Sequence, residues 1–158
     1  MSRHRGRLLT RLGGMVLGVV LLALTGPAVA VDFEHSRLVV ETVTGAHYRF
    51  EIELAKTPDQ LHQGLMFRDH LADDAGMLFL LGSEQIATFW MRNTFVPLDM
   101  LFIGRGGRIV NIRRNAVPGS SDLLTSERPV VAVLEVRAGL SARLGIRAGD
   151  RVVHPALD

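Results

Sequence analysis

The stretch HYRFEIEL, residues 47–54, alternates polar and apolar side chains at every position. A period of two places the apolar side chains on one face and the polar ones on the other, which is typical of a half-buried antiparallel strand. The preceding run from Arg37 to Val43 reads as a second strand, and residues 44–46 form a turn. Together the two runs predict a β-hairpin at the start of the domain.

The chain after the hairpin reads mostly as apolar strands separated by glycine, proline and polar loops. A Thr57-Pro58 capping pattern predicts a short helix that ends near Gly64, and a second short helix is expected over residues 140–144. Further strands are expected over residues 76–81, 86–91, 98–103, 108–116, 130–136 and 151–154, with a long polar loop over residues 117–129. The pattern predicts a mainly β fold, a single compact β-barrel or sandwich-like domain with two short helices.

The first thirty residues have the composition of a signal peptide. Four arginines between residues 3 and 11 precede an uncharged apolar run, and Ala28-Val29-Ala30 is a pattern that signal peptidase cleaves. We therefore expect residues 1–30 to be a signal peptide cleaved after Ala30, residues 31–158 to be a single globular β-rich domain, and the mature protein to be periplasmic or secreted. The alternative is a membrane-anchored protein with an uncleaved N-terminal segment, because the uncharged run is just long enough to span a thin bilayer.

The charge balance argues against a nucleic-acid partner. The full chain has 18 basic and 16 acidic residues, a net charge of +2, but all four charged residues of the first thirty are arginines. The mature domain therefore has 14 basic against 16 acidic residues, a formal charge of −2, and it has no basic cluster interleaved with aromatic residues. Membrane contact is expected only through the signal segment. The chain contains no cysteine, which excludes disulfides and a lipidated N-terminal cysteine.

Several short motifs follow one another between residues 64 and 150: GLMFR at 64–68, GMLF at 76–79, FWMRNT at 89–94, PLDMLFI at 97–103, VLE at 133–135 with Ala138-Gly139, and the Gly149-Asp150 turn. In this order and spacing the chain resembles a bacterial and archaeal family of uncharacterised proteins, the domain of unknown function DUF192, also named UPF0127. The resemblance extends from about Val39 to Val153. It implies a β-rich single domain that is often exported, and it implies no established activity.

Two acidic residues, Asp99 and Glu135, lie inside apolar strands between large hydrophobic neighbours. Such a carboxyl group must be paired, hydrogen-bonded, protonated or directed into a cleft, because an isolated buried charge is very costly. Our hypothesis is that both converge beside Trp90 with three polar neighbours and form a pocket for a small polar ligand or an envelope partner. The three neighbours are Arg68, Asn93 and Thr94. The alternative is that the carboxylates, and Asn93 with Thr94, only organise turns and loop backbone amides.

Two other functions are open at this stage. Two carboxyl groups about 5–10 Å apart can hydrolyse glycosides, so Asp99 and Glu135 could serve an envelope carbohydrate hydrolase. Four methionines in the motif block near Trp90 suggest periplasmic Cu(I) binding through thioethers, although methionine also fills gaps in apolar cores. These methionines are Met66, Met77, Met91 and Met100. The sequence indicates no cofactor and no zinc site, and it does not decide whether the protein is an enzyme.

Overall fold

The computed structural model describes residues 31–157, which form one mainly β domain with two α-helices, as the sequence predicts. The strands are β1 Glu34–Glu41, β2 His47–Ala55, β3 Ala75–Gln85, β4 Thr88–Phe89, β5 Leu98–Ile103, β6 Ile109–Ala116, β7 Leu124–Thr125, β8 Val130–Arg137 and β9 Arg151–Val153. The helices are α1 Pro58–Gln63 and α2 Leu140–Arg143, and 3-10 turns cover Arg105–Gly107 and Pro155–Leu157. The predicted signal peptide lies outside the described residues.

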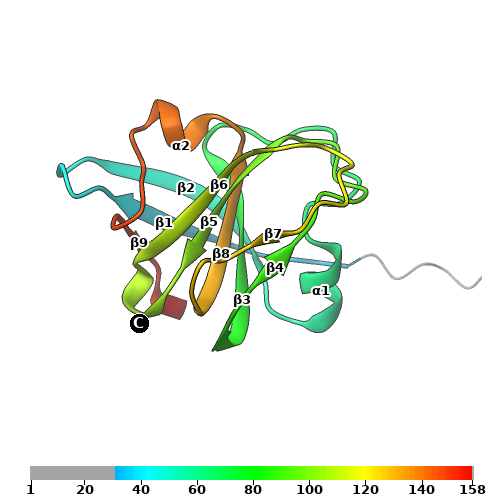
Figure 1. Ribbon diagram of the computed structural model, residues 1–158, viewed down its shortest axis with the longest axis horizontal. Coiled ribbons are helices and arrows are strands. Elements are labelled where there is room, and N and C mark those ends of the chain that lie inside the picture. The colour runs from blue at the N-terminus through cyan, green and yellow to red at the C-terminus, as the bar shows by residue number, and fades with distance from the viewer. Residues whose placement is uncertain (1–30, 158) are drawn as a thin grey trace, which may run out of the picture.

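Seven of the described strands form one curled sheet in the order β6-β5-β8-β3-β2-β1-β9 (Figure 1). The predicted hairpin is confirmed, since β1 and β2 pair antiparallel. Strands β2 and β3 run parallel, and the connection between them contains α1. The predicted capping box begins this helix: the Gln60 amide donates to Thr57 Oγ1 at 3.3 Å, and the Thr57 amide donates to Gln60 Oε1 at 3.0 Å. The local sequence thus determines where α1 starts. Because α1 belongs to the connection between the parallel strands β2 and β3, it lies against the sheet.

The two edges of the sheet meet at one end, which gives the sheet its half-barrel shape. The Ile109 amide of β6 donates to the Asp150 carbonyl, and the Gly149 amide donates to the Ile109 carbonyl, both at 2.8 Å. At Gly107 the backbone has a φ of +73°, and a Cβ atom there would lie 2.0 Å from the Val152 carbonyl oxygen. Only glycine permits this close approach, so the edge contact depends on the glycine-rich turn after β5.

Alternation along the central strands divides the buried side chains between two cores. The inner core lies in the hollow of the sheet and includes Leu38, Phe50, Leu78, Leu101 and Leu134. The outer core lies on the other face and includes Met77, Phe79, Met100, Phe102 and Val133. Residues of α1, β4 and β7 pack on the outer core, whereas α2 lies at one end of the curled sheet (Figure 1). Neighbouring residues of β5 and β8 therefore face opposite environments.

The structure differs from the sequence prediction mainly in the segments that cover the outer core. The strand expected over residues 86–91 is reduced to β4, which pairs only with β7. β7 itself lies inside the region predicted to be a long polar loop. Ile86 is half exposed, so this hydrophobic residue is not part of a buried central strand. Among residues 31–157, no helix has the length and apolar character needed to cross a membrane.

Candidate functional site

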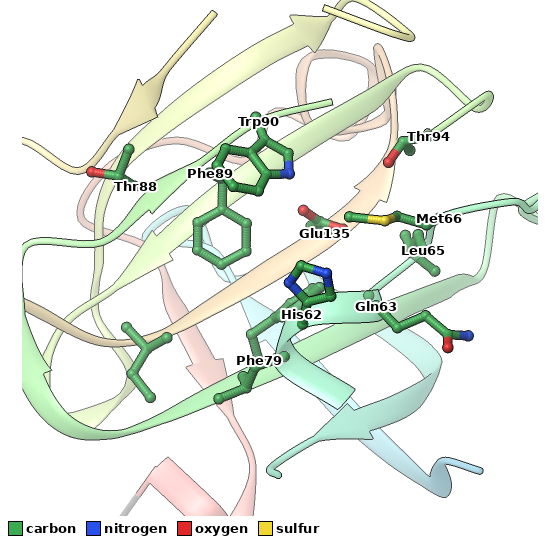
Figure 2. Close-up of a pocket in the computed structure, with 13 residues that line it drawn as sticks. His62, Gln63, Leu65, Met66, Phe79, Thr88, Phe89, Trp90, Thr94 and Glu135 are labelled. Atoms are coloured by element: carbon green, nitrogen blue, oxygen red, sulfur yellow. The ribbon is translucent and has the colours of Figure 1, made fainter. Parts of the chain in front are cut away.

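A cavity of about 250 Å³ lies over the outer face of the sheet, between α1, β3, β4 and β8. We call it the Trp90 cavity. Its apolar lining side chains are Leu61, Leu65, Met66, Phe79, Leu81, Phe89 and Trp90, and its polar ones are His62, Gln63, Thr88, Thr94 and Glu135. Figure 2 shows the Glu135 carboxyl group, the His62 ring and the Met66 thioether directed toward the same space below Trp90. Apolar walls with a few convergent polar groups are typical of small-ligand sites.

Glu135 is the most unusual group in this cavity. It lies in β8, two positions before the last residue of the strand, and its cross-strand neighbours are Met77 of β3 and Met100 of β5. The residue is only 4% exposed. Within residues 31–157, no side chain or backbone group forms a hydrogen bond or ion pair with its carboxyl oxygens. Desolvation by burial raises the pKa of Glu135 to about 8. At neutral pH it is therefore a protonated acid, able both to donate and to accept a hydrogen bond.

The segment after β4 holds Trp90 and Thr94 at the cavity. The Arg92 guanidinium carbon lies 4.8 Å from the centre of the Trp90 ring, and Arg92 Nε donates to Ser121 Oγ at 3.1 Å. Thr94 is buried, and its hydroxyl donates to the Arg92 carbonyl at 3.3 Å. This turn fixes the ring and the threonine side chain in place.

Asn93, which we predicted as a site residue, does not line the cavity. It occupies the left-handed region with a φ of 55°, a conformation that asparagine tolerates better than most residues. Its carbonyl accepts a hydrogen bond from the Phe67 amide at 2.8 Å. Phe67 is itself left-handed, with a φ of 64°. Asn93 thus joins two strained turns beside the cavity, which agrees with the alternative that it organises its own loop.

Arg68 is also outside the lining. Its guanidinium group forms an ion pair with Glu53 Oε2 at 2.5 Å and lies 5.7 Å from the centre of the Phe33 ring. We expected Arg68 to partner one of the two strand carboxylates. Its partner is instead Glu53 of β2, whose side chain is 17% exposed although its strand pattern placed it on the solvent face. The positive charge of Arg68 is therefore unavailable to Glu135.

Asp99 does not join Glu135 at the cavity, which corrects our hypothesis of convergence. Asp99 pairs with Val136 and Glu135 with Met100, and because paired residues share a face, the two carboxyl groups point to opposite faces of the sheet. Asp99 accepts hydrogen bonds from the Asn115, Gly139 and Ser141 amides and from the Ser141 hydroxyl, at 2.7–3.2 Å. A substrate cannot contact both carboxyl groups through the sheet, so the predicted hydrolytic pair has no geometric basis.

The four methionines of the motif block do not converge on the cavity either. Met66 lines it, whereas the other three are at most 1% exposed and belong to the outer core. Among residues 31–157, no group of three or more histidine, cysteine, aspartate or glutamate side chains is arranged to hold a metal ion. The methionines of the strands therefore pack as apolar side chains around Glu135.

Several residues of the cavity were not predicted from the sequence. His62, Phe79 and Phe89 were not among the expected site residues, although all three line the cavity. The capping box at Thr57 was the available signal for His62, because it fixes the start of α1 and hence which side chains the crossover carries over the sheet. Phe79 of β3 and Phe89 of β4 form an edge-to-face pair with ring centres 5.1 Å apart. No local sequence pattern predicts this contact between two strands.

Comparison with known proteins gives one family profile and several solved structures. Residues 39–154 match the profile of DUF192, described as an uncharacterized ACR. A structure from Sinorhizobium meliloti 1021, named as a proposed transcription regulator, is 43% identical with a TM-score of 0.79, covering 81% of this chain and 99% of its own. A protein of unknown function from Novosphingobium aromaticivorans DSM 12444 is 45% identical with a TM-score of 0.73, covering 76% of this chain and 85% of its own. No curated protein matches the chain.

Proposed function

The chain belongs to the DUF192 family, and from that premise we propose that it is a binding protein whose small ligand occupies the Trp90 cavity and bonds to Glu135. One observation carries the proposal. Glu135 is a residue only 4% exposed that lines this cavity, and its carboxyl group has no hydrogen bond or ion pair with any of residues 31–157. The ligand supplies the partner that the fold does not.

Glu135 costs folding stability relative to an apolar residue at the same position. Glu135 sits between Met77 and Met100, so a third methionine would continue an apolar row across three strands. Burying a polar group without a hydrogen bond costs roughly 1–3 kcal/mol in protein mutational data. A glutamate here therefore lowers stability unless something outside the fold bonds to it. Residues that break a local rule without an internal benefit are concentrated at functional sites.

Nucleic acid is not part of this proposal, although the S. meliloti relative is named as a transcription regulator. The predicted mature chain has a formal charge of −2. Nucleic-acid affinity comes largely from neutralising phosphates with lysine and arginine. In the described chain the arginines near the cavity are engaged by Glu53 and by Trp90 with Ser121. A small ligand fits a cavity of about 250 Å³ with mostly apolar walls better.

The cavity is tested by blocking it from α1. His62 is exposed and lines the cavity, so the larger side chain of His62→Trp is expected to obstruct it without disturbing the core. In a thermal-shift screen of small soluble compounds, a ligand at about 100 times its Kd should add roughly 2.7 kcal/mol to the unfolding free energy of the wild type. We expect the same compound to bind His62→Trp at least tenfold more weakly.

Asp59→Trp is the matched control, because it adds the same side chain to an exposed position of α1 outside the cavity lining. This variant should respond to the ligand as the wild type does. Equal affinity of the wild type and His62→Trp for every compound found would show that the ligands bind elsewhere. The proposal would then fail.

We further propose that the protein works outside the cytoplasm after loss of its first thirty residues. The support is the arginine-rich start, the apolar run and the Ala28-Val29-Ala30 pattern. Intact-mass measurement of protein from the periplasmic or culture fraction should give a chain beginning at Val31. A full-length mass in the membrane fraction would favour the uncleaved anchor instead.

A further inference from the structure

The charges around the Trp90 cavity specify what kind of ligand completes it. Glu135 and His62 are the ionisable residues among its lining side chains, and no lysine or arginine of the described chain is among them. The three arginines two positions from a lining residue have other partners: Arg68 pairs with Glu53, Arg92 contacts Trp90 and Ser121, and Arg137 donates to Asp73. The described part of the protein thus presents a buried acid in the cavity without a lysine or arginine beside it.

We infer that the ligand carries a small organic cation, a primary or quaternary ammonium group, which binds beside the Glu135 carboxyl group against the aromatic walls. The inference rests on the proposed binding function and names its ligand class. Phe79, Phe89 and Trp90 line the cavity together with the acid. Ring faces attract cations through their negative electrostatic potential, and a recurrent use of this attraction is the recognition of quaternary ammonium ligands.

Hydrocarbons and anions fit the site less well, because neither class interacts favourably with both the carboxyl group and the aromatic walls. A hydrocarbon would fill the space between the walls but would displace water from the carboxyl group and leave it without a hydrogen bond, which is costly. An anion would face an acid, and no lysine or arginine of the described chain is in the lining to receive its charge. A cation both pairs with the carboxylate and contacts the aromatic rings, so it uses every distinctive feature of the cavity.

Binding of a cation to this site is expected to release a proton. Because the pKa of Glu135 in the free protein is raised to about 8 by burial, the acid is protonated at neutral pH. An adjacent cation favours the ionised form. Affinity for the cation should therefore increase about tenfold per pH unit between roughly pH 6 and pH 7.5, and level off above pH 8.

Other charged groups must be separated from this pH dependence. The charged residues in the cross-strand row of Glu135 are Glu53 of β2 and Arg113 of β6, and Arg137 follows Glu135 two positions along β8. His62 of α1 lines the cavity, and Arg68 and Arg92 lie in the loops beside it. Glu53 is paired with Arg68, Arg137 donates to Asp73, and Arg113 donates to the Thr125 carbonyl. His62 is exposed and is the other ionisable side chain of the cavity lining. A His62→Gln variant should keep most of the pH dependence if Glu135 is its source.

The experiment compares matched cations and neutral molecules by calorimetry on the full mature protein. Choline and butylamine are the cations, and 3,3-dimethylbutan-1-ol and 1-butanol are their neutral counterparts of similar shape. We expect each cation to bind at least tenfold more tightly than its counterpart, with a measured heat that depends on the buffer because a proton is released. Glu135→Gln should lose this preference and the pH dependence.

The outcomes separate this inference from the function on which it rests. If the neutral molecules bind as tightly as the cations, or if neutral compounds from the screen bind and are blocked by His62→Trp while both cations fail, the cation inference is wrong and the cavity still binds ligands. If no cation binds and no compound from the screen distinguishes His62→Trp from the wild type, both proposals fail. Cation binding that persists unchanged in Glu135→Gln also overturns the inference.

Discussion

Replacing Glu135 by glutamine is expected to abolish a pH dependence of folding on the order of 4 kcal/mol between about pH 5 and pH 8.5. In the folded protein, burial raises the pKa of this carboxyl group from 4.5 to about 8. The folded protein therefore holds a proton that the unfolded chain releases once the pH exceeds about 4.5. The stability that depends on this proton is fully present below that pH and is lost as the pH rises through 8. Glutamine has the same size and no proton to lose.

Urea unfolding at the two pH values measures this effect. The wild type should lose stability toward pH 8.5, whereas Glu135→Gln should change little and be the more stable protein at high pH. Glu51→Gln is the control, because the Glu51 side chain is 63% exposed and forms a surface ion pair with Arg37. This variant should keep the pH dependence of the wild type. Parallel curves for the wild type and Glu135→Gln would show that the carboxyl group is not isolated.

A replacement of Glu135 that raises stability would indicate that the glutamate serves function and not folding. Most replacements in a buried strand lower stability, so a position where a neutral side chain raises it indicates a residue retained for another purpose. The same isolation that costs stability prepares the carboxyl group for a ligand, because no internal bond must be broken when the ligand arrives. Glu135→Gln should therefore be more stable at pH 8.5 and weaker in cation binding.

Local sequence signals predicted the parts of the fold that depend on neighbouring residues. The alternation over residues 47–54 gave the hairpin, and the pattern at Thr57 gave the start of α1, because both depend on side chains a few positions apart. The strand over residues 86–91 was predicted too long, since an apolar run does not reveal that only Thr88 and Phe89 pair with β7. The cavity itself depends on how α1 and β4 lie over the sheet, which no short stretch encodes.

The sequence identified both buried carboxyl groups but not their different roles. Asp99 and Glu135 each lie in an apolar strand, and the difference arises from the register of β5 on β8. A shift of one residue in that register would reverse which face each side chain occupies. The face then determines the environment: one carboxyl group meets the loops near α2, and the other meets the outer core. Register is set by contacts far apart in the chain, so spacing alone placed both residues in one pocket.

Replacing Asp99 by asparagine is expected to lower the unfolding free energy by roughly 2–4 kcal/mol and to leave ligand affinity unchanged. Each carboxylate oxygen of Asp99 accepts two hydrogen bonds: Oδ1 from the Asn115 and Gly139 amides, and Oδ2 from the Ser141 amide and hydroxyl. An asparagine must direct its NH₂ group at one of these donor pairs, so at least two bonds are lost in a site that is 0% exposed. Differential scanning calorimetry measures the loss.

Two comparisons decide whether Asp99 is structural. Ser141→Ala removes one of the four donors to the carboxylate and should cost less, about 1 kcal/mol. Because Asp99 faces away from the Trp90 cavity, the folded fraction of Asp99→Asn should bind choline as the wild type does, whereas Glu135→Gln should be stable and deficient in binding. An Asp99→Asn variant that keeps its stability and loses the ligand would contradict the assignment, because it would place the functional carboxyl group on the other face of the sheet. The opposite responses of the two variants follow from one structural fact, that adjacent strand positions present Asp99 to backbone donors and Glu135 to an open cavity.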